Sequence, residues 1–293
     1  MTRFLLMAVV AAVVVGASPW TRASNPGDVF RAENIDAWCI VPFDAKKRGP
    51  AERAEMLKRL GITGLAYDYR AEHVPTFDAE VEAMRGAGIA VTAWWFPAEL
   101  NDEARLILSV IKRQKITPQL WVTGGGEAPK DEAAQAARVG AEAARIRPIA
   151  EAAAGVGCKV ALYNHGGWFG EPENQIRIID RLKEQGVTNV GIVYNFHHGH
   201  GHIARFPELW KMMQPHVLAV NLNGMEVGGD EHGRKILTLG KGDRELAMMR
   251  VIAESGWRGR VGVIDHLPET DSEVTLRENL QGLEGLRRAL GEP

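Results

Sequence analysis

The sequence predicts a single α/β domain, a (β/α)8 barrel of the TIM-barrel class, over residues 24–293. Short apolar segments typical of buried parallel strands alternate strictly with helix-length segments, and eight such pairs fit into roughly 250 residues. Most predicted helices end in a glycine that leads straight into the next strand, at Gly61, Gly88, Gly155, Gly186 and Gly256. An open doubly wound sheet would need a glycine-rich phosphate turn after the first strand, where the sequence instead has DAKKRGP.

The first four strand–helix pairs follow a polar lead-in over residues 24–34. We predict the strands over residues 35–43, 62–70, 89–97 and 118–126, and the helices over residues 50–61, 76–88, 102–114 and 131–154. Pro50 suits the first turn of its helix, because the N–H that proline lacks would have no partner there.

The last four pairs follow the same pattern. We predict the strands over residues 159–165, 189–196, 216–225 and 259–266, and the helices over residues 171–185, 202–213, 243–255 and 272–290. Residues 226–243 (EVGGDEHGRKILTLGKGD) are too long for a bare connection, so we expect a lid or a binding loop there.

The N-terminus has the pattern of a signal peptide. Met1–Arg3 carries a positive charge, Phe4–Ala17 is apolar and uncharged, and small residues follow, with cleavage positions after Ala17 or Ala23. We therefore predict a signal peptide over residues 1–23 and an exported mature protein, periplasmic or secreted. The apolar run is short for a membrane span, so no stable membrane insertion is expected after cleavage; an uncleaved anchor is the alternative.

Charge and cysteine content exclude some classes of partner. The formal net charge is −2, and loss of residues 1–23 removes Arg3 and Arg22 and no acids, which leaves −4. A mildly acidic protein has no general field that attracts nucleic acid, and we expect a small-molecule carbohydrate partner instead. Cys39 and Cys158 are expected to be free, buried thiols. The oligomeric state stays open.

Polar side chains gather at the predicted carboxyl ends of the strands, where a barrel keeps its active site. Alternation along the strands places the following side chains inside the barrel: Ala161, Tyr163, His165, Val193, Asn195, His197, Ala219, Asn221, Asn223, Val263 and Asp265. Eight of the nine histidines lie at these ends or in the loops after them. Aromatic faces beside Asn and His donors suit a polyhydroxylated ligand, although each aromatic side chain taken alone could equally pack between strand and helix. The run HHGHGH (197–202) could likewise be fortuitous.

Five segments carry a resemblance to a known family: LYNHGGW, VGIVYNFHHGH, VLAVNLNGM, ILTLGKGD and SGWRGRVGVIDH. Together they resemble the xylose isomerase-like TIM-barrel family, the sugar phosphate isomerase/epimerase group, over most of residues 35–290. The chain looks like an exported member of this group with altered metal-ligand positions.

The resemblance also implies one divalent metal ion, Mn, Zn, Co or Mg. The family's usual ligands are a Glu ending strand five, an Asp and a His around strand six, a His or Asp on strand seven and a Glu on strand eight. The corresponding positions here are Tyr163, Asn195 with His198, Asn221 with Asn223, and Asp265. Hard cations prefer anionic oxygen and Asn offers only a neutral one, so His198 and Asp265 are the predicted metal ligands.

The predicted chemistry is proton abstraction next to a carbonyl of a sugar, as in an isomerase or epimerase. The predicted catalytic residues are His165, His198, Asp265 and His266, with His165 or Asp265 as the base and His198, His266, Asn223 or a metal at the enediolate oxygen. The predicted substrate-binding residues are Tyr67, Trp95, Tyr163, Asn164, Trp168, Asn195, Asn221 and Asn223.

Other functions are weighed against this one. A keto-glycoside lyase or hydratase begins with the same proton abstraction, and a non-catalytic sugar-binding barrel would also show lost carboxylates. A DNA-repair endonuclease is disfavoured because no multi-metal cluster or basic groove is visible. Hydrolysis by two carboxylates is weak, since only Asp68 or Glu127 could serve as a partner for Asp265.

Overall fold

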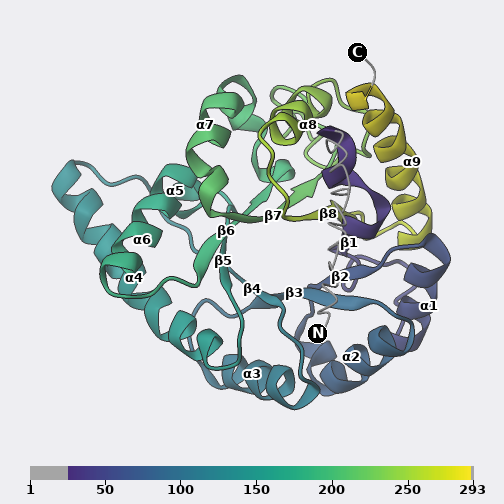
Figure 1. The fold of residues 1–293 in the computed structure, drawn as a ribbon, viewed down its shortest axis with the longest axis horizontal. Helices are drawn as coiled ribbons and strands as arrows, with labels where there is room; N and C mark the ends of the chain where they lie inside the picture. The colour runs from purple at the N-terminus through teal and green to yellow at the C-terminus, as the bar shows by residue number, and fades with distance from the viewer. Residues whose placement is uncertain (1–25, 292–293) are drawn as a thin grey trace, which may run out of the picture.

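The computed structural model describes residues 26–291 and confirms the closed barrel (Figure 1). Each strand pairs in parallel with the next, and β1 pairs with β8 to close the ring. The strands are β1 (Ile35–Trp38), β2 (Gly64–Tyr67), β3 (Ala90–Phe96), β4 (Gln119–Val122), β5 (Val160–Tyr163), β6 (Val190–Asn195), β7 (Val217–Leu222) and β8 (Arg260–Ile264).

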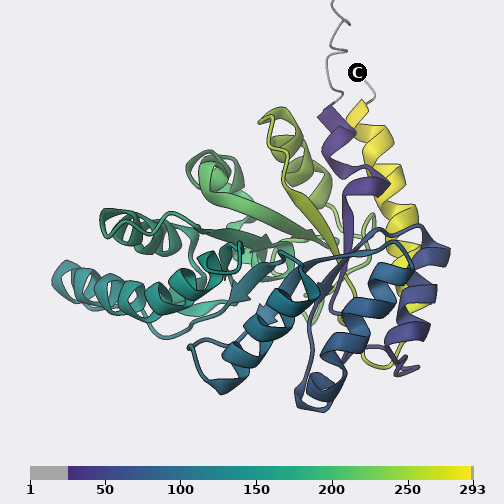
Figure 2. The same cartoon turned by 60° about the horizontal axis from the view of Figure 1, so that its bottom comes forward.

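Helices surround the strands on the outside of the ring (Figure 1). They are α1 (Pro50–Leu60), α2 (Phe77–Gly86), α3 (Asp102–Gln114), α4 (Glu132–Ala154), α5 (Gly167–Gly170), α6 (Pro172–Glu184), α7 (Phe206–Met213), α8 (Glu245–Glu254) and α9 (Ser272–Gly291). The short 3-10 helix η1 (Pro26–Phe30) lies beside α9 (Figure 2) and contributes the buried side chain of Phe30 to the outer core.

The predicted elements are all present, with two differences in extent. The predicted strands run too far at their carboxyl ends; β1, for example, ends at Trp38 and not at residue 43. Some of the residues beyond the strand ends, among them Cys39, Phe43 and Asp68, line the cavity described below. The helix predicted over residues 202–213 is instead a 3-10 segment, η5 (His200–Arg205), followed by α7, and α5 was not predicted.

The predicted signal peptide lies outside the described residues. Within residues 26–291, no helix is both long enough and apolar enough to cross a membrane. Both cysteines are free and buried, as predicted.

Two apolar cores lie on opposite sides of the sheet. The larger fills the space between strands and helices. The smaller fills the barrel, where two tryptophans and a tyrosine pack against small side chains: Trp38, Trp121, Tyr163, Ala66, Ala93, Ala161, Val193, Ala219 and Ile264. The rings of Trp38 and Trp121 meet edge to face with centroids 4.7 Å apart. The barrel interior is therefore filled mainly by three large aromatic rings, and any cavity at the carboxyl end of the barrel must lie above them.

The predicted alternation is confirmed for Ala161, Tyr163, Val193 and Ala219, and it is wrong for β8. There Ile264 belongs to the inner core, while Val263 packs toward the helices. The sequence VGVI is apolar at both alternations, so its pattern does not specify a face.

Gly262 explains which face of β8 turns inward. A Cβ at Gly262 would approach the Asn221 side-chain oxygen to 1.8 Å, so the amide of Asn221 on β7 occupies the space that an inward side chain at this position would need. The shift by one residue moves Asp265 away from the inward position that we predicted for it.

We expect Trp121→Ala to lower the free energy of unfolding by about 3–5 kcal/mol, because it removes a fully buried ring from the barrel interior. Leu106→Ala, at a side chain that is 39% exposed on α3, should change it by less than about 0.5 kcal/mol. Urea unfolding of both variants checks this. A loss below about 1 kcal/mol for Trp121→Ala would mean that the inner core is not packed as described.

Candidate active site

A cavity of about 300 Å³ opens at the carboxyl end of the barrel, directly above the inner core. Its walls come from the ends of six strands and from the loop after β7: Trp38, Cys39, Phe43, Asp68, Arg70, Trp95, Tyr163, His165, His197, His198, Lys235 and His266. This is the end where barrel enzymes keep their catalytic groups.

Three aromatic rings form the floor of the cavity. Trp38 and Tyr163 lie with ring centroids 5.9 Å apart, and Trp95 meets Tyr163 edge to face at 5.1 Å. The Trp38 indole N–H donates to the Tyr163 hydroxyl at 3.3 Å, which fixes both rings. Burial raises the pKa of Tyr163 well above its usual value, so its hydroxyl stays neutral. The floor is thus a rigid apolar surface with one hydroxyl, suited to the C–H face of a sugar ring.

Four imidazoles form one wall. The rings of His197 and His198 lie 3.9 Å apart, and His165 lies 4.6 Å from His198; His266 packs against Phe43 at 3.9 Å. Burial, with the nearby Lys235 charge, lowers the pKa of His165, His197 and His266 and brings that of His198 to about 2.

These imidazoles are therefore neutral near pH 7. Within the part of the chain that the structure describes, His198 Nε2 and His197 Nδ1 have no hydrogen-bond partner although both atoms are buried. Neutral rings can both donate and accept, so each of these two nitrogens has hydrogen-bonding capacity that the described residues do not use.

Asp68 is the one carboxyl group among the described residues that line the cavity. Its side chain is 2% exposed, and Oδ1 accepts from the Val41 N–H at 3.2 Å. Oδ2 is buried and has no hydrogen-bond partner among residues 26–291. Burial raises the pKa of Asp68 to about 7, against the opposing effect of Arg70. A carboxyl with one free oxygen and a pKa near the working pH can take and return a proton.

The cavity brings together five of the predicted site residues, namely His165, His198 and His266 of the predicted catalytic set and Trp95 and Tyr163 of the predicted substrate-binding set. It does not bring in Asp265, Tyr67, Asn164, Trp168, Asn195, Asn221 or Asn223.

Tyr67 and Trp168 lie on the helix side of the sheet. Tyr67 packs edge to face on Phe77 and Trp94, with centroids 5.9 and 4.8 Å away. The Trp168 indole N–H donates to Gln135 Oε1 at 2.6 Å, and its ring lies under the Arg138 guanidinium. Both are packing residues in this structure.

Three of the asparagines bind one another. Asn164 Oδ1 accepts from the Asn195 backbone N–H at 2.7 Å and from its side-chain amide at 2.9 Å. Asn221 Nδ2 donates to Asn195 Oδ1 at 2.6 Å. All three are buried, so the network holds the ends of β5, β6 and β7 together beside the inner core.

Asp265 and Asn223 also bind within the protein. Asp265 accepts from the Ser272 hydroxyl at the start of α9, because the alternation of β8 differs by one residue from our prediction. Burial raises the pKa of Asp265 to about 6. Asn223 Nδ2 donates to the carbonyls of Gly224 and Lys235, at 2.8 and 3.1 Å.

These placements test the divalent metal that the resemblance implies. Where the family has carboxylate ligands, this chain has Tyr163, whose hydroxyl is part of the cavity floor, and asparagines whose amides bind each other. The remaining predicted carboxylate ligand, Asp265, does not line the cavity with His198. Within residues 26–291, no three His, Cys, Asp or Glu side chains are grouped closely enough to hold a metal ion. The donor set does not fit a family-type cation site.

Trp38, Arg70 and Lys235 were not predicted as site residues, and Asp68 was considered only as a partner for Asp265 in hydrolysis. Ala66, Asp68 and Arg70 alternate on β2 and its extension, so a small, an acidic and a basic side chain on one face could have indicated the site. The residue predicted from this segment was Tyr67, which faces the other way. Lys235 comes from a long loop, whose path no local pattern predicts.

That loop, residues 226–243, was predicted to be a lid or a binding loop, and in the structure its backbone is held by contacts to neighbouring segments. His200 contacts the carbonyl of Glu226 at 2.8 Å through Nδ1 and that of Lys235 at 3.1 Å through Nε2. A bridge between Gly224 and Leu237 closes its base. Lys235 is therefore presented to the cavity by a held backbone.

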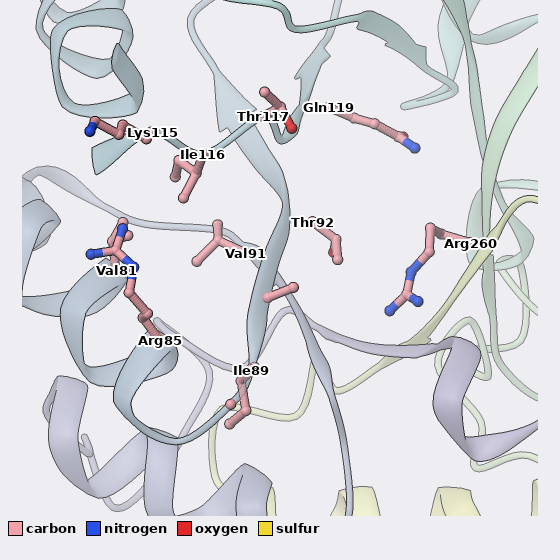
Figure 3. A pocket seen from close by; sticks show the side chains of 12 residues that line it. Val81, Arg85, Ile89, Val91, Thr92, Lys115, Ile116, Thr117, Gln119 and Arg260 are labelled. Atoms are coloured by element: carbon pink, nitrogen blue, oxygen red, sulfur yellow. The ribbon is translucent and has the colours of Figure 1, made fainter. Parts of the chain in front are cut away.

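A second depression lies at the opposite, amino-terminal end of the strands (Figure 3). Arg85 and Lys115 lie on one side of β3 and Gln119 and Arg260 on the other. Arg260 is paired with buried Asp36, and Arg85 donates to the Gln114 side chain at 3.1 Å. No predicted site residue lines it.

No family model and no curated protein matches the sequence. Solved structures do match. A xylose isomerase domain protein from Alicyclobacillus acidocaldarius is 20% identical, with a TM-score of 0.60 over 87% of this chain and 99% of that one. The chain has the xylose isomerase-like TIM-barrel fold.

Two further structures with this fold carry chemical descriptions of their own. The 3-keto-D-glucoside 4-epimerase YcjR from E. coli is 15% identical, with a TM-score of 0.62 over 86% of this chain and 99% of that one. The IOLI protein, solved with a bound zinc atom, is 13% identical, with a TM-score of 0.61 over 88% of this chain and 98% of that one.

Because its donor set lacks grouped carboxylates, we expect the protein to retain well under one ion per chain after loading with Mn²⁺, Co²⁺ or Zn²⁺ and desalting. Elemental mass spectrometry measures this. Retention near one ion per chain that is lost in His198→Ala would show that a metal binds at the cavity, against the donor set described above.

Proposed function

We propose that this protein is an enzyme that acts on a carbohydrate by moving a proton at the carbon next to a carbonyl, as an isomerase or epimerase does. The observation that carries the proposal is Asp68, a buried carboxyl with a pKa of about 7 and one free oxygen in the cavity wall. The neighbouring structure described as a 3-keto-D-glucoside 4-epimerase supports it at the level of reaction class.

The sugar lies with its C–H face on Trp38, Trp95 and Tyr163. Ionised Asp68 takes the proton from the carbon next to the carbonyl, and the C–H electrons form the C=C bond of an enediolate. The carbonyl oxygen receives the negative charge. Neutral His198 and the Lys235 ammonium stabilise this charge.

Return of the proton from Asp68 completes the reaction. Delivery to the neighbouring carbon, with transfer of the hydroxyl proton there to the former carbonyl oxygen, gives isomerisation. In epimerisation a second group donates a proton to the other face of the same carbon, and Asp68 loses its own proton to solvent. Loss of a leaving group from the enediolate, as in a keto-glycoside lyase, is the third outcome of the same first step. The first step is common to all three, so the test below monitors it alone.

We expect Asp68→Asn to lower exchange of the substrate C–H proton with solvent by about 10²–10⁴-fold, since an amide cannot accept that proton. Proton NMR in D2O, over a panel of keto-sugars and keto-glycosides, measures the exchange. The matched variant is Asp265→Asn, which changes a buried carboxyl outside the cavity and should retain exchange.

Two results would contradict the assignment. Exchange that survives in Asp68→Asn and disappears in Asp265→Asn would restore the base that we predicted from the sequence. Sugar binding without exchange in the wild-type protein would identify a binding barrel.

The pH dependence follows from the direction of the Asp68 shift. Burial raises its pKa from 3.8 to about 7, so the carboxylate that acts as base is lost as pH falls below about 7. We expect kcat/KM to fall by about tenfold per pH unit below that point. A rate profile from pH 5 to 9 checks it, and a flat profile across pH 5–7 would exclude Asp68 as the base.

Export of the enzyme is part of the proposal and rests on the apolar run Phe4–Ala17. A substrate met outside the cytoplasm is more simply a free sugar derivative than a phosphorylated intermediate. N-terminal sequencing of protein from the periplasm or medium tests the processing after Ala17 or Ala23.

A further inference from the structure

We propose that the substrate is a sugar acid, a carbohydrate whose carboxylate is bound by Lys235 and Arg70 at the cavity. This inference rests on the proposed function and names its substrate class. It starts from the charges that line the cavity: one ammonium, one guanidinium and one carboxyl, that of Asp68. With four neutral imidazoles in the same wall, the cavity has more positive than negative charge.

Lys235 is a cation without a protein counter-ion. Its backbone carbonyl is held at 3.1 Å by both Asn223 Nδ2 and His200 Nε2. In the described part of the chain, its ammonium makes no ion pair or hydrogen bond. Lys235 lines the same cavity as the four imidazoles, and its charge contributes to the lowered pKa of each of them.

Arg70 lies at the exposed side of the cavity. Its Nη1 donates at 2.8 Å to the carbonyls of Asp68 and Tyr69, and its guanidinium lies 5.4 Å from the centre of the Phe43 ring. The two hydrogen bonds therefore orient the Arg70 guanidinium through Nη1 alone. Nη2 makes no hydrogen bond to the described residues, so it is available to a ligand oxygen.

Asp68 cannot serve as the missing counter-ion and as the base together. A carboxylate that was firmly paired with Lys235 would have a lowered pKa, whereas burial raises that of Asp68 to about 7. A negatively charged group on the ligand would balance the charge of the cavity.

A carboxylate fits better than a phosphate. Barrel enzymes commonly bind phosphate at the loops after strands seven and eight and at a helix N-terminus there. Here Glu245 already accepts from the backbone N–H groups of Met225, Gly240 and Gly242. Asp44 accepts from that of Ser272 at the start of α9. A phosphate dianion at either helix would meet an acidic side chain in place of free N–H groups.

The test measures binding apart from turnover. Calorimetric titrations use the Asp68→Asn variant with paired probes: glucose and glucuronate, galactose and galacturonate, mannose and mannuronate, plus gluconate and glucose 6-phosphate. We expect at least one acid to bind about tenfold or more tightly than its neutral partner at low salt, and its advantage to shrink as salt is added.

Lys235→Met should remove most of that advantage, because the affinity for the acid should fall much more than the affinity for its neutral partner. The control is Lys241→Met, an exposed lysine in the same loop that does not line the cavity and should leave the advantage intact. Equal binding of every acid and its neutral partner, or an advantage that survives Lys235→Met, would overturn the proposal. Tighter binding of glucose 6-phosphate than of any carboxylate would overturn the choice of carboxylate.

Failure of this proposal differs from failure of the proposed function. Proton exchange on neutral keto-sugars without any preference for acids would leave the reaction standing and remove the sugar acid. Tight binding of an acid to the wild-type protein that depends on Lys235, without proton exchange, would support the sugar-acid ligand and contradict the proposed reaction.

Discussion

The packing of Trp38, Trp121 and Tyr163 inside the barrel is the constraint on which the site depends. Eight strands enclose a fixed space, and here three large rings fill it against alanines on neighbouring strands. The cavity can therefore begin only above these rings, where Trp38 and Tyr163 present their upper surfaces. The floor of the cavity is apolar apart from the Tyr163 hydroxyl, and the charged groups and imidazoles lie in the wall around it. The depth of the cavity and the chemical character of its floor both follow from how the barrel interior is filled.

The ends of β5, β6 and β7 add a second constraint. Asn164, Asn195 and Asn221 are buried, and each must find hydrogen-bond partners or lose the solvation that it had in water. They find one another, which fixes the relative positions of three strands and keeps their amides out of the cavity. Positions that could have held charged ligands for a cation thus serve to join strands. In the proposed reaction, the chemistry falls to Asp68 on the opposite side of the barrel and to the imidazoles after β5, β6 and β8.

The fold could be predicted from the sequence, whereas the site could be predicted only in part. The spacing of apolar residues that distinguishes strands from helices can be seen within a short stretch of sequence. In most strands it also predicted which side chains face into the barrel, as Tyr163 and Ala219 confirm. On β8 both alternations are apolar, so only the contact between Gly262 and Asn221 on the next strand decides the face, and Asp265 was misplaced as a result. Lys235 reaches the cavity through a loop held by His200, a contact across 35 residues that no local pattern encodes.

Burial of Asp68 and the positive charge of the cavity act on each other. Removing water from Asp68 raises its pKa to about 7, and a bound carboxylate close by would raise it further, because like charges disfavour ionisation. A base that stayed protonated at neutral pH could not abstract a proton. Arg70, which already acts to lower the pKa of Asp68, would offset that repulsion, so that binding an acid and ionising Asp68 become compatible. This links the proposed substrate to the proposed base.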